Sequence, residues 1–301
     1  MRELVVISGK GGTGKTSIVA SFAAMDGKKV LADCDVDAAD LHLVLEPTVR
    51  SSEAFYGGNE AVIRTEDCVG CGEFEARCRF DAVRVGRNQA GDTTYSIDPV
   101  ACEGCGVCVH VCPVDAIDFP RKKNGDWFIS DTRHGPMVHA KLGIAEENSG
   151  KLVTLVRNQA KQIAKEQGAS LIVVDGAPGI GCPVIASITG ADLVLVVTEP
   201  TMSGLHDLER VVALAHHFSI KTVVCINKFD LNEEMTAAIE RRSAEVGAQV
   251  IGRVHYDVAV TKAQLEKKSI VEYCHTGTTR EIEDMWSRLH EMLCVEAEAS
   301  E

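Results

Sequence analysis

The chain has 301 residues, of which 45% are hydrophobic and 25% charged, and its 44 acidic and 31 basic side chains give a formal net charge of −13. This composition is typical of a globular protein, and the acidic excess argues against DNA, RNA or an anionic membrane surface as the main partner. No apolar run approaches the roughly 18 residues of a membrane helix, and because the strand-like Glu3–Ile7 follows the first residues at once, we expect no secretory peptide. We therefore expect a cytoplasmic protein, in a reducing compartment where clustered thiolates bind metals more often than they form disulfides.

Short apolar runs alternate with amphipathic stretches along most of the chain. Six runs are continuous and rich in β-branched residues, as buried parallel strands are: Leu4–Ser8, Val30–Asp33, Leu171–Asp175, Leu193–Val197, Val223–Asn227 and Val250–Val254. Helical patterns lie between them, at Ser17–Met25, Ser149–Glu166, Ser203–His217 and Glu233–Val246. This alternation predicts an α/β fold with a doubly wound, mostly parallel sheet that binds its ligands at the carboxyl ends of the strands.

One segment breaks the alternation. From about residue 60 to residue 121 the sequence is rich in Gly and Cys and lacks helix-length periodicity. We interpret it as a small inserted α+β domain, which divides the larger domain into residues 1–59 and 122–301. Seven of the 12 cysteines lie between Cys68 and Cys112, so metal ligands are expected in this insertion.

A phosphate-binding loop follows the first predicted strand. The segment Gly9-Lys10-Gly11-Gly12-Thr13-Gly14-Lys15-Thr16 matches G-x-x-x-x-G-K-[ST] and is followed by a helical pattern. Its glycines allow a tight turn in which successive N–H groups point at the phosphates of a nucleotide. The motif predicts that Lys15 contacts the β- and γ-phosphates, that Thr16 binds Mg²⁺, and that the nucleotide site comprises Gly11, Gly12, Thr13, Gly14, Lys15, Thr16 and Ser17.

The early lysine makes this loop resemble the deviant Walker A motif of the MinD/ParA/Mrp ATPases. In that family the lysine reaches across a nucleotide-sandwiched dimer to the partner's phosphates. The resemblance therefore implies a catalytic role for Lys10 beside Lys15. It also implies a homodimer, or a heterodimer with a paralogous ATPase, that binds ATP and ADP.

Three further segments at the ends of predicted strands extend the resemblance. Asp33-Cys34-Asp35 resembles switch I, Asp175-Gly176-Ala177-Pro178-Gly179 resembles switch II, and Asn227 begins the segment with which the family reads the base. The resemblance implies that Thr16, Asp35 and Asp175 hold Mg²⁺, that Asp35 lies near the attacking water, and that Asn227 binds adenine. An aspartate after a strand is often only a cap or turn residue, but two of them beside a phosphate loop favour Mg²⁺. With no strong general base in these motifs, we expect a slow, switch-like ATP hydrolase.

The cysteine-rich segment contains one complete ferredoxin motif. Cys102-x-x-Cys105-x-x-Cys108-x-x-x-Cys112-Pro113 has the spacing of bacterial ferredoxins. Zinc is the alternative, but four cysteines this closely spaced before a proline favour a [4Fe–4S] cluster. By the crossed ligation of two-cluster ferredoxins, we expect Cys78 to complete the cluster of Cys102, Cys105 and Cys108.

The first motif of the segment is incomplete. Phe74 stands where the third cysteine is expected, which leaves Cys68, Cys71 and Cys112 as three thiolates for the second cluster. We expect either a [3Fe–4S] cluster, a [4Fe–4S] cluster with an open iron site, or no second cluster. Glu73 and Glu75 either supply an oxygen ligand there or simply face solvent.

The other cysteines are expected to be packing residues. Cys34 and Cys225 lie in or beside predicted strands, where cysteine behaves as a small hydrophobic residue. Cys182 follows the switch II segment, and we interpret it as a buried thiol in preference to a ligand.

The combination resembles a subgroup of MinD-like ATPases with an inserted two-cluster ferredoxin domain, found largely in anaerobes and associated with the orange protein and metal-cluster assembly. The resemblance rests on the motifs above, on Pro200–Leu208 and on Gly179–Pro183. It implies an ATPase whose nucleotide state controls an Fe–S module, which delivers metal or clusters to a client or, alternatively, passes electrons to a redox protein. A MinD- or ParA-type positioning protein needs a basic amphipathic end or a basic DNA surface. The acidic Glu296–Glu301 instead leads us to expect neither nucleic acid nor stable membrane anchoring.

Overall fold

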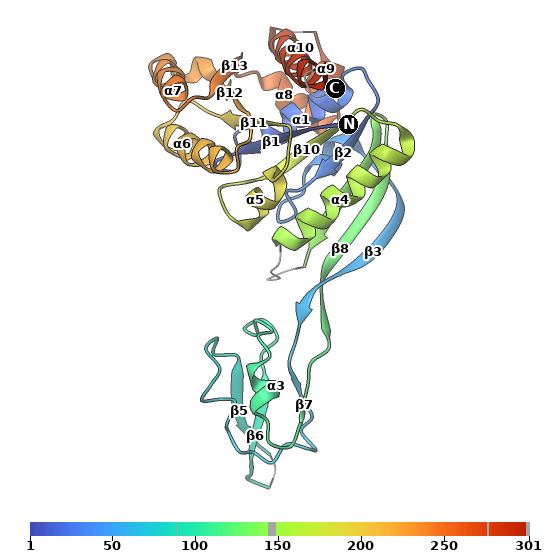
Figure 1. Cartoon of the computed structure of the whole chain (residues 1–301), viewed down its shortest axis with the longest axis vertical. Helices are drawn as coiled ribbons and strands as arrows, with labels where there is room; N and C mark the ends of the chain where they lie inside the picture. The colour runs from blue at the N-terminus through green and yellow to red at the C-terminus, as the bar shows by residue number, and fades with distance from the viewer. Residues whose placement is uncertain (89, 144–148, 276, 299–301) are drawn as a thin grey trace. The chain divides into compact units, whose positions relative to one another are not determined.

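The computed structural model describes residues 1–88, 90–143, 149–275 and 277–298, which fold as two compact units (Figure 1). The large unit combines Met1–Glu53 and Trp127–Lys141 with the chain from Ser149 onward. The small unit comprises Ala54–Asp126 together with Leu142 and Gly143. Residues 60 and 121, where the sequence predicts the insertion to begin and end, therefore lie inside the small unit.

The large unit is built on a nine-stranded sheet of order β13-β12-β11-β1-β10-β2-β9-β8-β3. Its strands are β1 (Arg2–Ser8), β2 (Lys29–Asp33), β3 (Thr48–Asn59), β8 (Arg121–Thr132), β9 (Gly135–Leu142), β10 (Leu171–Pro178), β11 (Leu193–Thr198), β12 (Thr222–Asn227) and β13 (Gln249–Val254). Every pair from β13 to β9 is parallel. The predicted mostly parallel α/β sheet is thus confirmed, and its six predicted strands lie within β1, β2 and β10 to β13.

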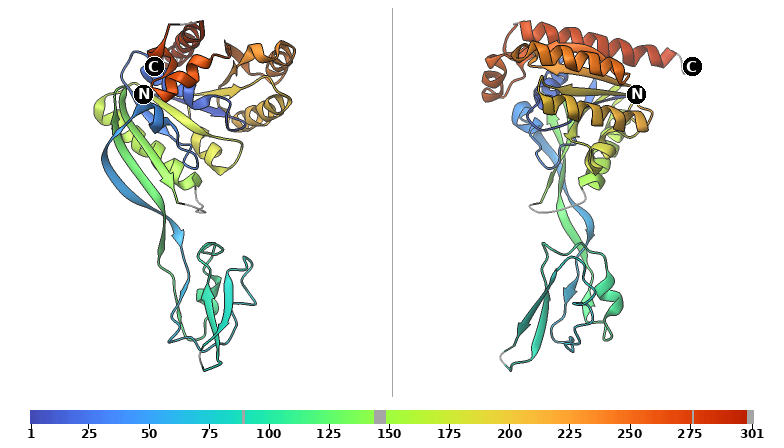
Figure 2. Two further views of the ribbon diagram at one scale, coloured as in Figure 1. Left: turned by 180° about the vertical axis from the view of Figure 1, so that it is seen from behind. Right: turned by 90° about the vertical axis from the view of Figure 1, so that its left-hand side faces the viewer.

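Helices cover both faces of this sheet (Figures 1 and 2). On one face lie α1 (Lys15–Ala24), α2 (Leu41–Leu45), α8 (Val258–Leu265), α9 (Ile270–Tyr273) and α10 (Gly277–Glu298). On the other lie α4 (Ser149–Gln167), α5 (Cys182–Ile188) and α6 (Met202–His217), with α7 (Glu233–Glu245) beside α6 and β13. The four predicted helices correspond to α1, α4, α6 and α7.

Burial on both faces explains why the central strands are continuous apolar runs. Successive side chains of a strand point to opposite faces, so a strand covered on both sides buries all of them. In β1, Leu4, Val5, Val6 and Ile7 are all fully buried. Leu4 and Val6 join the core below α1 and α10, in which the Phe22 and Trp286 rings lie 5.0 Å apart between centroids.

In the part that the structure describes, the small unit contains two antiparallel strand pairs and one short helix. β4 (Val62–Ile63) pairs with β7 (Ile117–Asp118), β5 (Val83–Arg87) pairs with β6 (Thr93–Ile97), and α3 spans Val107–Val111. Its buried core consists of Ala61, Phe74, Tyr95 and Ile117. Four of the cysteines pack against this core: Cys68, Cys102, Cys108 and Cys112.

Two strands of the large sheet carry the chain into and out of the small unit. β3 begins at Thr48, shortly after α2 ends at Leu45, and β8 returns the chain. The two strands are neighbours in the sheet order. No helix in the part of the chain that the structure describes is both long and apolar enough to cross a membrane.

Candidate functional site

The loop between β1 and α1 has the conformation that its glycines allow. Gly14 caps α1 at its N-terminus with a φ of 93°, in the left-handed region that side chains disfavour. A Cβ at this position would also collide with the side-chain amide of Asn227. The loop therefore requires glycine here both for its backbone angle and for its contact with the end of β12.

A pocket of about 530 Å³ opens at this loop, within the size range of small-molecule sites. Its lining combines Gly11 to Ser17, Asp35, Pro178, Asn227 and Lys228 with residues after β13, namely His255, Tyr256, Asp257, Thr261 and Gln264. The structure thus gathers the predicted phosphate loop, the predicted switch I aspartate and the predicted adenine-binding asparagine around one cavity. It lies at the carboxyl ends of parallel strands, where such sheets bind ligands.

Lys15 lies between the two aspartates that the resemblance assigns to Mg²⁺. Its Nζ is 2.5 Å from Asp175 Oδ1 and 3.3 Å from Asp35 Oδ2. Burial lowers the pKa of Lys15, but the charges of Asp175 and Asp35 outweigh burial and raise it above its ordinary value. For Asp35, burial has the opposite effect and raises the pKa, and the charge of Lys15 opposes this rise. Lys15 is therefore a charged counterion for both carboxylates.

Two buried oxygens beside this triad have no hydrogen-bond partner among the described residues. They are Asp175 Oδ2 and Thr13 Oγ1. A buried carboxylate oxygen without a partner is costly, and a hard divalent cation is the kind of ligand that would satisfy it. The donor set of Thr16, Asp35 and Asp175 therefore fits Mg²⁺, which characteristically binds a few protein oxygens together with phosphates.

Asp33, the first residue of the switch I segment, positions that segment. It is fully buried, and its carboxylate accepts hydrogen bonds from the backbone N–H groups of Asp35 at 3.1 Å and Leu41 at 3.3 Å. Burial, with the neighbouring Asp175, raises the pKa of Asp33. These bonds fix the turn that leads from β2 through Asp35 to α2.

Lys10 is held within its own chain by a residue that the sequence does not predict. Its Nζ lies 2.7 Å from Glu199 Oε1 and 2.9 Å from Ser203 Oγ. The other carboxylate oxygen of Glu199 lies 3.2 Å from Lys228 Nζ, which also donates to the carbonyl of Gly12 at 3.0 Å. Burial tends to raise the pKa of Glu199, but the two lysines lower it overall. The only sequence signal for Glu199 is its place after the predicted strand Leu193–Val197.

The other side of the pocket also contains residues missing from the sequence prediction. His255 Nδ1 lies 2.8 Å from Glu281 Oε2, and its Nε2 lies 3.0 Å from Thr278 Oγ1. Asn227 donates from Nδ2 to the carbonyl of Thr13 at 2.6 Å, so its amide supports the phosphate loop in this structure. The carboxyl end of the predicted strand Val250–Val254 is the signal that points to this loop.

In the small unit, four thiols line one cavity: Cys78, Cys102, Cys105 and Cys108. We call them the cavity set; they are the four residues expected to bind the complete cluster. The remaining three, Cys68, Cys71 and Cys112, form what we call the open set. Cys68 and Cys112 pack against the core, and Cys112 Sγ accepts a hydrogen bond from the N–H of Ala116 at 3.2 Å. Among the described residues, no group of three or more His, Cys, Asp or Glu is arranged to hold a single metal ion.

The remaining cysteines differ in exposure: two are buried, Cys182 and Cys294 are exposed, and Cys274 is partly buried. Cys34 and Cys225 are fully buried as predicted, and burial raises the pKa of Cys225 to about 12. The prediction that Cys182 is buried is wrong, because it is exposed. Cys182 is the first residue of α5, and the buried residues of this helix lie further along it, at Val184, Ser187 and Ile188.

Together, the doubly wound sheet, the phosphate loop and the paired carboxylates define a P-loop nucleotide-binding protein. Residues 4–270 match the family model of the CobQ/CobB/MinD/ParA nucleotide binding domain. The chain therefore belongs to this family of P-loop ATPases, as the resemblance of its motifs implies.

The chain is similar to two proteins of known sequence and to solved structures. Two uncharacterized proteins of Methanocaldococcus jannaschii are 37% identical over 235 residues (76% of this chain and 79% of the relative) and 25% identical over 241 residues (77% and 83%). The structure of the septum site-determining protein MinD from Pyrococcus horikoshii, complexed with Mg-ADP, has a TM-score of 0.57 at 14% identity. It covers 96% of this chain and 95% of its own, and it shows the shared fold alone.

Proposed function

We propose that this protein is a Mg²⁺-dependent ATPase that works as a nucleotide switch. The observation that carries the proposal is the contact of Lys15 with Asp35 and Asp175, because Lys15 and Asp35 also line a pocket of about 530 Å³. When a nucleotide binds, its phosphates would replace the carboxylates around Lys15. Asp35 and Asp175 would then be available, with Thr16, to hold Mg²⁺, which neutralises charge on the phosphates. The Mg-ADP complex of the P. horikoshii relative supports this assignment.

We propose further that two subunits sandwich ATP, with Lys10 of each reaching the nucleotide of the other. Lys10 is only partly buried, and its contacts with Glu199 and Ser203 can be exchanged for phosphate oxygens. The dimer is either a homodimer or a heterodimer with a paralogous ATPase. M. jannaschii contains two relatives of this chain, which supports the heterodimer as the alternative to the homodimer.

The small unit is proposed to be an inserted ferredoxin-like module. The shared cavity of the cavity set supports one [4Fe–4S] cluster on Cys78, Cys102, Cys105 and Cys108. The buried core of four residues is small for a chain segment of this length, and such units commonly need metals or disulfides. All seven of its cysteines are free thiols, which favours metal. The open set is proposed to hold a second cluster, either [3Fe–4S] or [4Fe–4S] with an open iron site.

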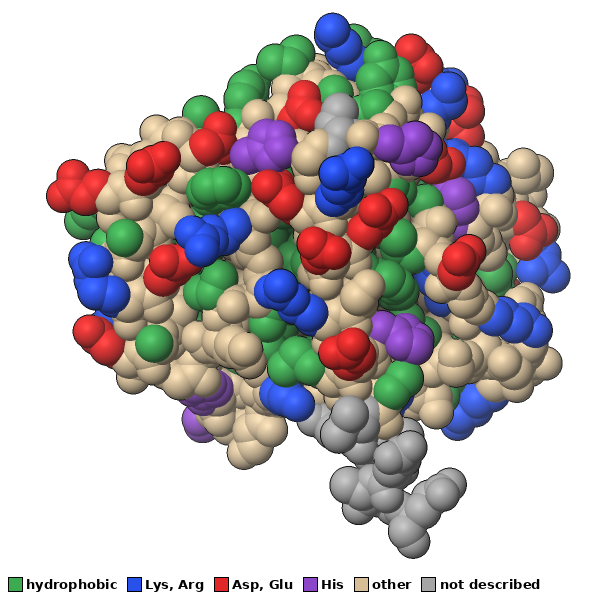
Figure 3. Space-filling model, turned by 90° about the horizontal axis from the view of Figure 1, so that it is seen from above, with side chains coloured by type: hydrophobic (Ala, Val, Ile, Leu, Met, Phe, Trp, Pro, Cys, Tyr) green, Lys and Arg blue, Asp and Glu red, His purple; other side chains and the backbone are tan. Residues whose placement is uncertain are grey.

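Nucleotide state and cluster state are proposed to be coupled, for assembly or delivery of metal clusters to a client protein. The chain passes from Asp35 through α2 into β3, which leads to the cysteines, so a shift of switch I has a short covalent route to the small unit. ATP-gated electron transfer to a redox client is the second candidate, favoured by the ferredoxin spacing of Cys102 to Cys112. Acidic and basic side chains are interspersed on the face drawn in Figure 3, which favours a protein client over nucleic acid.

Electron paramagnetic resonance of anaerobically isolated protein, with and without Mg-ATP, tests the coupling. We expect cluster signals whose shape or intensity changes with Mg-ATP in the wild-type chain and not in Lys15→Ala. Two reduced [4Fe–4S] signals that ignore the nucleotide would contradict both the coupling and the open iron site. Equal ATP hydrolysis by wild type and Lys15→Ala would contradict the switch itself.

A further inference from the structure

One helix in the wall of the pocket lies outside the phosphate-binding motifs. This helix, α8, lines the pocket through Val260, Thr261 and Gln264. The phosphate loop and Lys15 line the same pocket. A nucleotide with its phosphates on that loop must extend its nucleoside along the remaining lining, of which α8 is a part. The position of α8 therefore affects how well the pocket fits a nucleotide.

Side-chain hydrogen bonds hold both ends of α8. At its C-terminal end, Gln264 Nε2 donates to Ser17 Oγ in the first turn of α1 at 2.9 Å. At its N-terminal end, Asp257 Oδ1 accepts from the N–H of Ala259 at 2.7 Å and thereby caps the helix. Asp257 Oδ2 accepts from Thr278 Oγ1 at 3.2 Å, and Thr278 lies in the first turn of α10. The Thr278 hydroxyl therefore ties the start of α8 to α10.

The same hydroxyl also contacts His255, which lines the pocket. His255 Nε2 lies 3.0 Å from Thr278 Oγ1, and Nδ1 lies 2.8 Å from Glu281 Oε2, which also accepts from the backbone N–H of His255 at 3.0 Å. Thr278 is fully buried, whereas the side chains of His255 and Glu281 are 32% and 31% exposed. A Cβ on Gly277 would lie 3.1 Å from His255 Cε1, so the imidazole lies directly against the first turn of α10.

The protons available to these groups allow two arrangements. A carboxylate only accepts, so Nδ1 donates to Glu281. Thr278 has a single hydroxyl proton, which can go to Asp257 or to His255 Nε2 but not to both. When Nε2 is protonated, it donates to Thr278, and the hydroxyl donates to Asp257. When Nε2 is unprotonated, the hydroxyl turns to it and Asp257 loses this donor. One proton on His255 therefore decides whether Thr278 ties α8 to α10.

The other titratable groups that the described residues place around this cluster come from four elements. They are Glu281 of α10, Asp257 before α8, Asp230 of η1 (Phe229–Leu231), which accepts from the N–H of Tyr256 at 2.6 Å, and Cys225 of β12. Burial raises the pKa of Cys225 to about 12, so this thiol stays neutral. Among the residue types of the cluster, histidine is the one that ordinarily changes its charge between about pH 5 and 8.

We propose that His255 is a positioning residue, whose protonation at Nε2 lets Thr278 fix α8 against the nucleotide. This inference rests on the proposed nucleotide binding at the same pocket. A wall that is already fixed loses less freedom on binding, so the protonated form binds nucleotide more tightly. By linkage, nucleotide binding then draws a proton from the buffer onto Nε2.

Calorimetric titration of the full-length protein with Mg-ADP between about pH 5.5 and 8.5 tests the proposal. Wild type is compared with His255→Gln, Thr278→Val and Thr278→Ser, and with Glu283→Gln, an exposed carboxylate of α10, as the matched control. The ratio of two affinities at one pH cancels the ionisation of the nucleotide. We expect wild type to bind about fivefold more tightly than Thr278→Val at the acid end, the effect of one hydrogen bond, and equally at the alkaline end.

Proton uptake gives a second readout, which a hydroxyl that merely packs would not change. Titrations in two buffers of different ionisation enthalpy measure the protons bound together with Mg-ADP. Near neutral pH, wild type, Thr278→Ser and Glu283→Gln should take up more protons than His255→Gln and Thr278→Val. Circular dichroism at each pH confirms that the variants are folded.

The outcomes separate this inference from the proposed function. If Thr278→Val binds more weakly by the same factor at every pH, or if Thr278→Ser behaves like Thr278→Val, the role of the hydroxyl is overturned while nucleotide binding stands. A wild-type pH dependence that persists in His255→Gln overturns the role of His255 in the same way. A wild-type chain that binds no Mg-ADP at any pH overturns the proposed nucleotide site itself.

Discussion

Lys10 and Glu199 form an ion pair of 2.7 Å within one subunit, so the lysine that is proposed to reach across the sandwich is here bound in cis. The same carboxylate contacts Lys228 at 3.2 Å, and Lys228 in turn contacts the phosphate loop at Gly12. Glu199 therefore links Lys10 to the phosphate loop. Release of Lys10 from Glu199 is a necessary step in formation of the proposed sandwich.

Substitution of Glu199→Gln is expected to raise the basal rate of ATP hydrolysis about fivefold. A partly exposed ion pair contributes about 1 kcal/mol, and its loss removes that cost from the release of Lys10. The rate is measured over a range of protein concentrations, with light scattering to follow dimerisation in ATP. Glu209→Gln, which breaks an ion pair with Arg242 remote from the pocket, is the matched control.

Lys10→Ala is expected to bind nucleotide without hydrolysing it. Unchanged hydrolysis by this variant would remove the case for the ATP-bridged dimer.

Lys15→Ala is expected to lower the free energy of unfolding by about 3 kcal/mol in the absence of nucleotide. The change leaves Asp175 buried without its counterion, which is strongly destabilising. Millimolar Mg²⁺ should restore part of the loss, because the cation replaces the ammonium group between the two carboxylates. Urea unfolding with and without Mg²⁺ measures both effects. Lys10→Ala is the control, since Glu199 keeps Lys228 as a partner; an equal loss in both variants would contradict the special role of Lys15.

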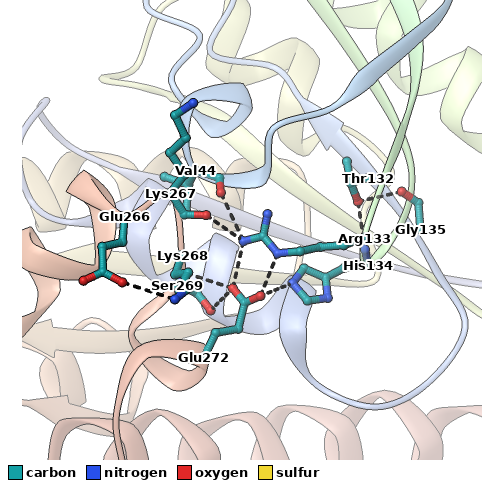
Figure 4. A network of polar contacts seen from close by, with 10 residues as sticks. All are labelled: Val44, Thr132, Arg133, His134, Gly135, Glu266, Lys267, Lys268, Ser269 and Glu272. Atoms are coloured by element: carbon teal, nitrogen blue, oxygen red, sulfur yellow. Dashed lines mark hydrogen bonds and ion pairs between the residues drawn. The ribbon is translucent and has the colours of Figure 1, made fainter.

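Glu272 ties the turn between β8 and β9 to the start of α9 (Figure 4). Its two oxygens accept from Arg133 at 2.7 and 2.9 Å, and one of them also accepts from Ser269 Oγ at 2.7 Å. Burial opposes the ionised form, but Arg133 and Ser269 outweigh it and lower the pKa of Glu272 from 4.5 to about 2.

This pKa gives stability a defined pH dependence. The folded-state pKa is lowered, so the contribution is fully present above pH 4.5 and is lost as the pH falls toward 2. After allowance for partial exposure, the contribution is about 2 kcal/mol. Glu272→Gln should lose this amount in urea unfolding at pH 7, and the difference from wild type should shrink steadily below pH 4.5. A difference that stays constant down to pH 3 would contradict the assignment.

Cys78 provides the test of crossed ligation. It belongs to the first cysteine motif in sequence but lines the cavity of the second. Cys78→Ala is therefore expected to remove the [4Fe–4S] signal of the cavity set and to lower the iron content by about four per chain. Cys182→Ala, an exposed cysteine outside both sets, should leave the spectra unchanged. If Cys112→Ala removes the cavity-set signal and Cys78→Ala does not, the ligation is not crossed.

The central half of the fold could be predicted because its strands are buried on both faces. Each of β1, β2 and β10 to β13 is a continuous apolar run, and such a run predicts a buried strand from the local sequence alone. β3 could not be predicted, because all its residues before Phe55 are exposed, and polar side chains there give no continuous run. The helices α8 to α10 follow the last predicted strand and pack on a face already occupied by α1, which only the folded chain reveals.

The residues of the candidate site also fall into those that the sequence could predict and those that it could not. Lys15, Asp35 and Asp175 could be predicted because their roles depend on motifs local in sequence. Glu199 and His255 could not, since each acts through a contact with a residue far away in the chain, Lys10 and Glu281 respectively.

In the proposed switch, the pairing of Lys15 with two carboxylates also links nucleotide binding thermodynamically to cation binding. A nucleotide that takes Lys15 without Mg²⁺ leaves Asp35 and Asp175 facing each other and the phosphates as uncompensated charges. A cation that enters first competes with an ammonium group already in place. Each ligand therefore raises the affinity of the other by the same factor. The proposed site is accordingly expected to select the complex of nucleotide and Mg²⁺ over either ligand alone.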